Sequence, residues 1–326
     1  MSTTRSISSA VNGSAAGTYT AVGGEELDRD RKGRPGFSIA LLNRGARPFR
    51  RDFFEELCRL GALEVISLES APCPYDVEAL SRRHGKLRFL IFPEAVNIGA
   101  RIDAAFREAV GEHVFVLWGD MKVNAAGISS RVFAKVTERG RLCTVPAFRD
   151  GDGGILPTVL GPLPGPGGTF DVQPSAAGSG EPATLAPWDY AGLYRKDKHL
   201  ALGGFDHKIE ESWWQKLDYG MRAWLWGEEI RVHSALRIGY LDEPPAEDAS
   251  FGPGYRRFFL KNVAVRRPGD AGSLPRSRWR SYRRSSGESS GATREVWREI
   301  RAWVHENRYR FARDAAYLTE TWEWDG

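Results

Sequence analysis

A single carboxylate follows one of the most apolar short segments of this chain. Residues 114–118 are all apolar, and Gly119 and Asp120 come directly after them. A run of this length between glycines is typical of a buried strand in an α/β sheet, and such sheets bind ligands at the carboxyl ends of their strands. Because a carboxylate there needs a cation or a hydrogen-bonded partner, Asp120 is a candidate ligand for a metal that bridges two phosphates. The alternative is a solvated Asp that opens a turn.

The elements that would position Asp120 alternate along the first half of the chain. Apolar runs at 37–42, 63–68, 87–92, 113–118 and 142–145 predict strands, and amphipathic stretches at 48–60, 76–84, 98–109 and 128–136 predict helices. This alternation is typical of βαβ units. We therefore expect an α/β fold with a doubly wound, mostly parallel sheet, in which Asp120 ends the fourth strand.

Composition excludes several classes of protein. With 326 residues, of which 41% are hydrophobic, the chain can bury a full core. No apolar stretch of about 18 residues is present, so a transmembrane segment is not expected. The three cysteines are widely spaced, which argues against a disulfide framework or zinc site and favours a reducing compartment. Residues 1–35 are expected to be a disordered leader rather than a secretory signal, in a cytoplasmic protein.

Positive charge is concentrated near the C-terminus. Residues 255–284 contain ten Lys and Arg side chains and one acid, Asp270. Such a cluster can contact an anionic membrane surface, phosphorylated ligands or nucleic acid, or form a solvated flexible segment. Trp279 and Tyr282 lie among the basic residues, and no nucleic-acid-binding signature accompanies them. We favour a peripheral membrane or acidic-ligand contact and expect no nucleic acid partner.

Well-known nucleotide and hydrolase motifs are absent. The turn after the first predicted strand, residues 43–48, lacks the Gly-x-Gly-x-x-Gly pattern of dinucleotide sites. No P-loop is present, and no Gly-x-Ser-x-Gly elbow follows a predicted strand.

Three other segments occur in an informative order. The first predicted strand ends at Asn43, Asn97-Ile-Gly99 begins the helix before the Asp120 strand, and Gly203-Gly-Phe-Asp206 is followed by Asp218, Arg222 and Gly227. Together they resemble the family-2-like glycosyltransferases of GT-A fold, which transfer a sugar from a nucleotide donor. The matching blocks are the N-x-G … DxD block and the G-G-F-D … E-D-x-D-L-x-x-R block. The resemblance spans residues 36–262.

The resemblance implies a donor site and a metal. Asp120 matches the last Asp of DxD, which holds a divalent cation, Mn²⁺ or Mg²⁺, and Glu69 stands where the family often has an Asp against the base. The candidate residues for the nucleotide sugar are Asn43, Arg44, Glu69, Asn97, Gly99 and Arg101. His233, after a short strand-like run, is a candidate third metal ligand, although a lone His is more often structural. Arg44 and Arg101 have surface salt bridges as their alternative role.

The sequence also departs from the family pattern. Trp118 replaces the first Asp of DxD, and Gln215 and Lys216 replace the Glu-Asp pair that supplies the general base. The remaining candidates for a base within hydrogen-bond reach of an acceptor hydroxyl are Glu210, Glu211 and Asp218. Asp218 has an alternative role, because Arg222 lies one helical turn away and can pair with it. A different mechanism and a non-catalytic relative both remain open.

Other features bear on the acceptor and on the chain's organisation. Sugar rings stack on aromatic faces, so Trp188 and Trp213 are candidates for the acceptor site, with core packing as the alternative. The resemblance adds Asp206, the last residue of the Gly-Gly-Phe-Asp piece in its acceptor-side block. The irregular loop at 149–187 is a candidate lid. Residues 263–292 are expected to be a basic flexible linker, and residues 293–326 a C-terminal amphipathic helix.

The sequence therefore predicts a metal-assisted glycosyltransferase that uses a nucleotide sugar and a glycan or lipid-linked acceptor in envelope synthesis. The alternative is a non-catalytic nucleotide-sugar-binding relative that acts as a scaffold or partner subunit. A third interpretation is an unrelated α/β enzyme that shares only the Asp120 strand.

Overall fold

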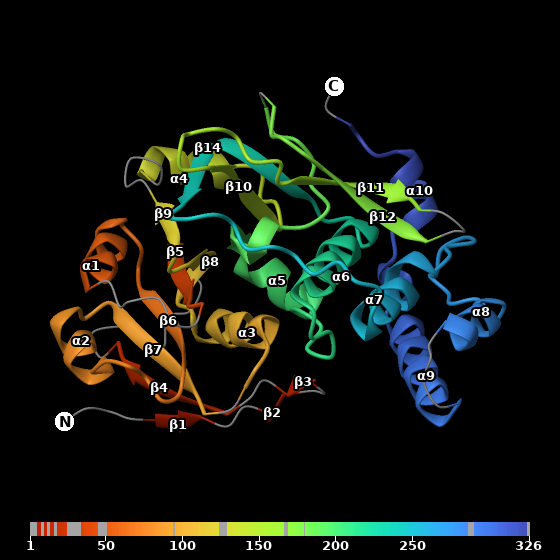
Figure 1. Cartoon of the computed structure of the whole chain (residues 1–326), viewed down its shortest axis with the longest axis horizontal. Helices are drawn as coiled ribbons and strands as arrows, with labels where there is room; N and C mark the ends of the chain where they lie inside the picture. The colour runs from red at the N-terminus through yellow and green to blue at the C-terminus, as the bar shows by residue number, and fades with distance from the viewer. Residues whose placement is uncertain are drawn as a thin grey trace.

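A computed structural model shows a mixed α/β molecule with a central sheet and a helical C-terminal part (Figure 1). It describes residues 5–7, 10–11, 14–15, 18–24, 34–44, 51–93, 95–123, 129–165, 169–178, 180–285 and 290–324. Residues 48–50 and 128, expected at helix starts, and much of the expected leader lie outside these ranges.

Ten strands of the described residues form one sheet, in the order β1-β4-β7-β6-β5-β8-β13-β10-β14-β9. Their bounds are β1 Arg5–Ile7, β4 Tyr19–Gly23, β5 Arg34–Leu42, β6 Val65–Ser70, β7 Leu87–Phe92, β8 Gly111–Trp118, β9 Met121–Val123, β10 Cys143–Arg149, β13 Gly192–Arg195 and β14 Ile230–Tyr240. The central strands β7, β6, β5 and β8 are parallel neighbours. The predicted α/β class and parallel centre are confirmed.

The sheet differs from the expected order at its two sides. β10 was expected to continue the parallel series, but β13 lies between β8 and β10 and is antiparallel to both. On the other side, β4 lies within the expected disordered leader, yet it pairs with β7 and buries Tyr19, Ala21 and Val22. Burial of these apolar side chains gives β4 a reason to be ordered.

Helices cover the sheet and bury their apolar faces. They are α1 Arg51–Arg59, α2 Val77–Arg83, α3 Ile98–Glu108, α4 Ser130–Thr137, α5 Lys196–Leu202 and α6 Ser212–Leu225. In α3 the predicted stripe of Ile102, Ala105 and Phe106 is fully buried, and the Asn97 side chain caps its first turn. The candidate lid contains a hairpin of β11 Val159–Pro164 with β12 Phe170–Ser175.

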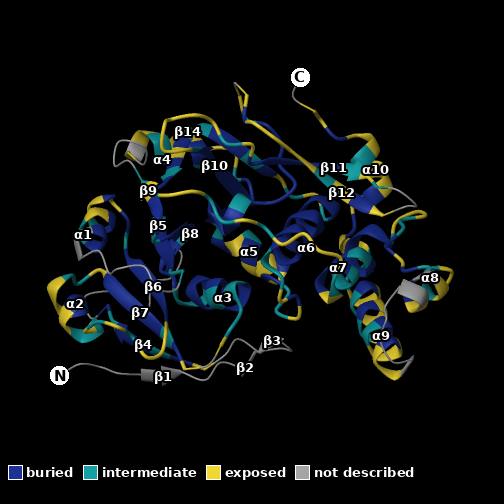
Figure 2. Ribbon diagram, viewed as in Figure 1, coloured by how far each residue is buried: buried dark blue, intermediate teal, exposed yellow. Residues whose placement is uncertain are grey.

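A second core lies at the C-terminal end, around α6. It is built with α7 Pro253–Phe258, the π-turn Phe259–Val263, α8 Arg278–Ser285, α9 Ser290–Glu306, the 3₁₀ turn Arg308–Arg310 and α10 Ala315–Glu320. Ile300 and Val304 of α9 are buried in it, while the outer faces of α8 and α9 are exposed (Figure 2). The segment expected to be a flexible linker thus contains α8. No helix in the described part of the chain has the length and apolar character needed to cross a bilayer.

Candidate functional site

A cavity of about 590 Å³ opens at the carboxyl ends of β5, β6 and β8. This is the edge where α/β sheets bind ligands. Five residues predicted for the donor and metal sites line it: Asn43, Arg44, Glu69, Arg101 and Asp120. Side chains of α1 and the segment 70–75 form one wall, and Leu241 and Asp242 after β14 complete it. The structure therefore brings together most of the predicted donor-site residues.

Arg44 connects two buried carboxylates at this edge. Its Nε lies 3.2 Å from Asp120 Oδ2, and its other end forms an ion pair with Asp189 Oδ2. The guanidinium carbon also lies 3.9 Å from the centroid of the Trp118 ring, which is a cation–π contact. Because both Asp side chains are nearly inaccessible to solvent, the guanidinium compensates much of the cost of burying their charge.

Asp189, which sequence reasoning missed, is a strained and electrostatically perturbed member of the cluster. Its φ of 50° lies in the left-handed region, which few residues other than glycine adopt. Burial raises the pKa of its carboxyl to about 6, against the opposing charges of Arg44 and Lys216. Tyr240 donates a hydrogen bond of 2.9 Å to Oδ2, and Trp118 Nε1 donates one of 2.7 Å to the backbone carbonyl. The sequence drew attention to 188–190 only for its aromatic rings.

Glu69 organises the polar wall formed by β6. Its Oε1 accepts hydrogen bonds from Asn43 Nδ2 at 2.7 Å and from Ser67 Oγ at 2.5 Å. Burial, followed by the charge of Glu69, raises the pKa of the Tyr75 hydroxyl. Arg101 donates from Nε to the carbonyl of Val96 at 2.9 Å, and burial lowers the pKa of its guanidinium. This wall presents fixed donors and acceptors next to an arginine.

Of the two metal ligands that the resemblance implies, Asp120 lies at this edge and His233 does not line the cavity. His233, the expected third ligand, lies early in β14, where its Nε2 is 3.2 Å from Glu181 Oε1. The structure does not bring it to Asp120, whose carboxylate pairs with Arg44. No three His, Cys, Asp or Glu side chains among the described residues gather as a metal site. Mg²⁺ in nucleotide sites usually keeps several waters and is held by one or two carboxylates together with substrate phosphates, so the divalent cation stays a prediction.

The predicted catalytic carboxylates lie away from the cavity lining. Asp218 is fully buried and pairs with Arg222 and Lys261, each at 3.1 Å, while Asn262 Nδ2 donates to its other oxygen at 2.8 Å. Asp206 pairs with Lys261 at 2.7 Å and with Arg257. These charges lower the pKa of Asp206 despite its burial. The bracing role considered for Asp218 therefore matches its surroundings.

Glu210 and Glu211 have different positions. Glu210 is exposed, and Glu211 accepts a hydrogen bond of 3.1 Å from the backbone N–H of Gly254. Neither lines the cavity.

Gln215 and Lys216 fill the positions of the missing Glu-Asp pair. Gln215 is buried and accepts hydrogen bonds from Tyr190 at 2.8 Å and from the backbone N–H of Gly99 at 3.0 Å. Lys216 pairs with Glu247 and lies within 6 Å of the centroids of three aromatic rings, those of Trp188, Tyr190 and Trp213. Two predicted acceptor residues, Trp188 and Trp213, therefore surround a buried cation.

Asn97 and Gly99, predicted for the donor site, have structural partners. Asn97 caps α3 and its Nδ2 donates to the carbonyl of His207 at 2.7 Å. A Cβ at Gly99 would lie 2.5 Å from Cβ of Phe205, so glycine is required by close packing.

Comparison with protein-family models gave no match, and comparison with curated protein sequences also gave none. Among solved structures, a crystal structure of GalNAc-T7 with UDP, GalNAc and Mn²⁺ matches with a TM-score of 0.51 and 11% identity, covering 89% of this chain and 58% of that one. A crystal structure of residues 1–349 of S. aureus TarS gives a TM-score of 0.47 and 13% identity, covering 81% of this chain and 70% of that one.

The chain has a GT-A-like glycosyltransferase fold, as the sequence resemblance predicted. It spans little more than half of the GalNAc-T7 chain that it matches.

Proposed function

We propose that the cavity binds a nucleotide sugar and that the protein is a glycosyltransferase. The observation that carries this is the gathering of Asn43, Arg44, Glu69, Arg101 and Asp120 around one cavity, in a GT-A-like fold. Its volume lies in the range of small-molecule sites. The acceptor we propose is a glycan or lipid-linked glycan of envelope synthesis. The three cysteines are free, in keeping with the reducing cytoplasm that we propose for it.

Arg44 is the residue that we propose to donate hydrogen bonds to the diphosphate. A guanidinium offers five N–H donors in a planar fork that matches phosphate oxygens. Asp120 and Asp189 hold this fork at the edge of the cavity, and Arg101 adds a second positive charge to the lining. The divalent cation stays a prediction of the family resemblance, because Asp120 is the only one of its two predicted ligands at the cavity.

A second candidate function is nucleotide-sugar binding without transfer. It is favoured by Gln215 and Lys216, which replace the carboxylates of the family base, and by the ion pairs that enclose Asp218. Such a protein would bind the donor and act as a scaffold or partner subunit.

The test is a thermal-shift panel of UDP-, GDP- and dTDP-sugars, each with Mn²⁺ or with EDTA. A ligand at 100 times its Kd stabilises by roughly 2.7 kcal/mol. Because hydrogen bonds to charged groups contribute about 1.5–3 kcal/mol, Arg44→Ala should weaken binding about 10- to 100-fold. Arg59→Ala is the matched control, since Arg59 is exposed on α1.

The outcomes distinguish a role of Arg44 in binding the diphosphate from a role of a metal ion. A shift that persists in EDTA and disappears in Arg44→Ala supports the arginine. A shift that needs Mn²⁺ and survives in Arg44→Ala contradicts the role of Arg44. The diphosphate would then be bound by a metal ion on Asp120. No shift with any nucleotide contradicts the donor site itself. Release of the nucleoside diphosphate from the bound donor then distinguishes a transferase from a binding protein.

A further inference from the structure

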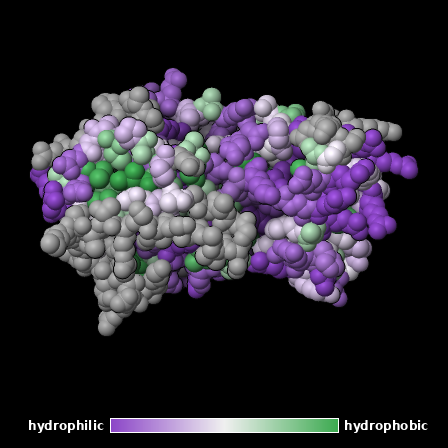
Figure 3. All heavy atoms as spheres, turned by 90° about the horizontal axis from the view of Figure 1, so that it is seen from below, coloured by the Kyte–Doolittle hydropathy of each residue, from purple (hydrophilic) through white to green (hydrophobic). Residues whose placement is uncertain are grey.

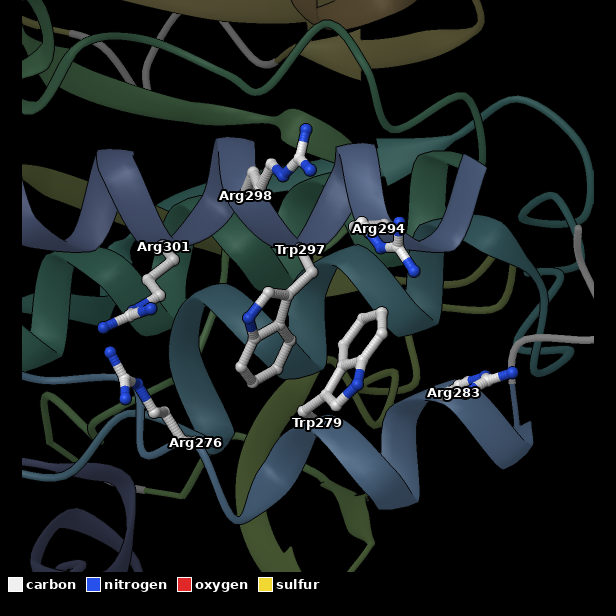
Figure 4. A pocket seen from close by; sticks show the side chains of 7 residues that line it. All are labelled: Arg276, Trp279, Arg283, Arg294, Trp297, Arg298 and Arg301. Carbon is white, nitrogen blue, oxygen red and sulfur yellow. The ribbon is translucent and has the colours of Figure 1, made fainter. Parts of the chain in front are cut away.

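A second hollow, of about 330 Å³, lies between α8 and α9 at the C-terminal end of the molecule. Its lining consists of two tryptophans and five arginines: Arg276, Trp279, Arg283, Arg294, Trp297, Arg298 and Arg301. The ring centroids of Trp279 and Trp297 lie 5.4 Å apart and join the two helices. Figure 4 shows the rings between the helices, with arginines on either side of them. The contact between the two tryptophans therefore holds α8 and α9 together, and these helices carry most of the arginines.

Four of the five arginines of this hollow lack an acidic partner among the described residues, unlike basic residues elsewhere in the segment. Arg257 and Lys261 pair with Asp206, which ties them into the second core. In contrast, no acidic residue of the described ranges lines the hollow. Among the described residues, none forms an ion pair with the exposed side chains of Arg276, Arg294, Arg298 or Arg301.

The placement of the charges indicates a compact anion. The guanidinium groups of Arg276 and Arg301 point toward one another from the two sides of the hollow (Figure 4). Like charges that converge in this way repel each other, and a cleft lined by one sign of charge attracts counter-ions. The surface around this end of the molecule is mostly hydrophilic (Figure 3).

We propose that the α8–α9 hollow binds an anion that carries at least two phosphate groups. Guanidinium forks bind phosphate through paired, charge-assisted hydrogen bonds. Even without Arg283, the four remaining arginines exceed the charge of one phosphate monoester, which is about −1.5 to −2 at neutral pH. Since the hollow measures only about 330 Å³ between α8 and α9, a compact head group or soluble diphosphate fits it better than an extended nucleic acid. The inference does not rest on the proposed transferase function.

The experiment compares two variants that lose the same charge. Arg276→Gln/Arg301→Gln removes one arginine from each side of the hollow, whereas Arg278→Gln/Arg280→Gln removes two arginines of α8 that do not line it. Each protein is titrated with inorganic pyrophosphate by calorimetry. Each is also sedimented with vesicles of phosphatidylcholine, with and without cardiolipin, whose head group carries two phosphates. Any binding at the β5–β8 cavity is the same in all three proteins and cancels.

We expect wild type to bind at least one probe and the hollow variant to bind it at least about tenfold more weakly, with the control unchanged, because two charge-assisted contacts are lost. Loss with pyrophosphate alone identifies a soluble diphosphate, and loss with cardiolipin vesicles identifies a lipid head group. If both variants bind the probe more weakly to the same extent, the effect depends on net charge and not on the hollow, and the proposal is overturned. Absence of binding to either probe would also overturn it. Equal thermal midpoints of the three proteins show that the variants are folded.

Discussion

Asp120 and Asp218 are both buried carboxylates that pair with arginine, but their surroundings differ. Asp218 is enclosed by Arg222, Lys261 and Asn262, so its charge and hydrogen-bonding capacity are used within the protein. Asp120 shares Arg44 with Asp189 at the edge of a cavity that a ligand can enter. The comparison shows that one buried carboxylate can be enclosed by partners of the protein while another, of the same type, lines a cavity.

The two clusters also differ in charge balance. Around Asp218, the carboxylates Asp206, Asp218 and Glu299 pair with a larger number of cations, which are Lys208, Arg222, Arg257 and Lys261. At the cavity edge, one guanidinium faces two carboxylates. The burial of Asp189 is reflected in its raised pKa. We therefore expect mutations in the first cluster to change stability, and mutations in the second to change pH dependence and ligand binding.

Asp218→Ala should have the largest effect, on stability. Removing one partner of a buried ion pair costs about 3–5 kcal/mol, because the remaining charges are left buried and uncompensated. Urea unfolding of the variant measures this loss. Glu210→Ala is the control, since Glu210 is exposed and its removal should change the free energy of unfolding by no more than about 0.5 kcal/mol. An Asp218→Asn protein of normal stability that loses sugar transfer would instead make Asp218 catalytic.

Asp189→Asn should change how stability depends on pH. The folded-state pKa of Asp189 is raised from 3.8 to about 6, chiefly by burial. The folded protein therefore binds this proton more tightly than the unfolded chain. That contribution is fully present below the unfolded pKa and is lost as the pH rises through about 6. Because Asn cannot ionise and tolerates a positive φ, the variant should gain stability relative to wild type over this window.

The size of that gain follows from the shift. One pKa unit corresponds to about 1.4 kcal/mol, so roughly 3 kcal/mol is the upper estimate. Urea unfolding of both proteins from about pH 4 to pH 7 measures it, with the exposed Asp270→Asn as the control. A difference between wild type and Asp189→Asn that is constant across this range would show that Asp189 titrates normally.

Local pattern was sufficient to predict the centre of the fold and one side of the site. The apolar runs of β5, β6 and β8 predict parallel strands whose carboxyl ends lie at the same edge of the sheet. Residues that follow these strands, such as Asn43, Arg44 and Asp120, are therefore expected to lie close together. The antiparallel insertion of β13 was not predicted, because a short strand between β8 and β10 leaves no periodic signal of its partner.

The remaining side of the site depends on long-range contacts. Asp189 lies 145 positions from Arg44, and no spacing rule relates them. His233 was assigned to the metal because of its residue type, but Glu181, a residue of the long irregular segment, is its partner. A left-handed backbone at Asp189 also has no signature in a sequence that places a tryptophan before it and a tyrosine after it.

Trp118→Phe should have the smallest effect and addresses how the binding region holds Arg44. Trp118 stands where the family has the first Asp of DxD, and here its ring lies against the guanidinium while Nε1 donates to the Asp189 carbonyl. Phenylalanine keeps an aromatic face of lower cation–π strength but lacks the indole N–H that donates this hydrogen bond.

We expect the affinity of the Trp118→Phe protein for the nucleotide to fall by about 1 kcal/mol, roughly fivefold, because Arg44 and the Asp189 backbone are held less firmly. Calorimetric titration of the nucleotide sugar measures this change, with Trp226→Phe as the matched control, because Trp226 is a partly buried tryptophan that packs against the second core and does not line the cavity. An unchanged affinity in Trp118→Phe would show that the two carboxylates alone position the guanidinium. A loss as large as that of Arg44→Ala would make the indole an equal partner in the site.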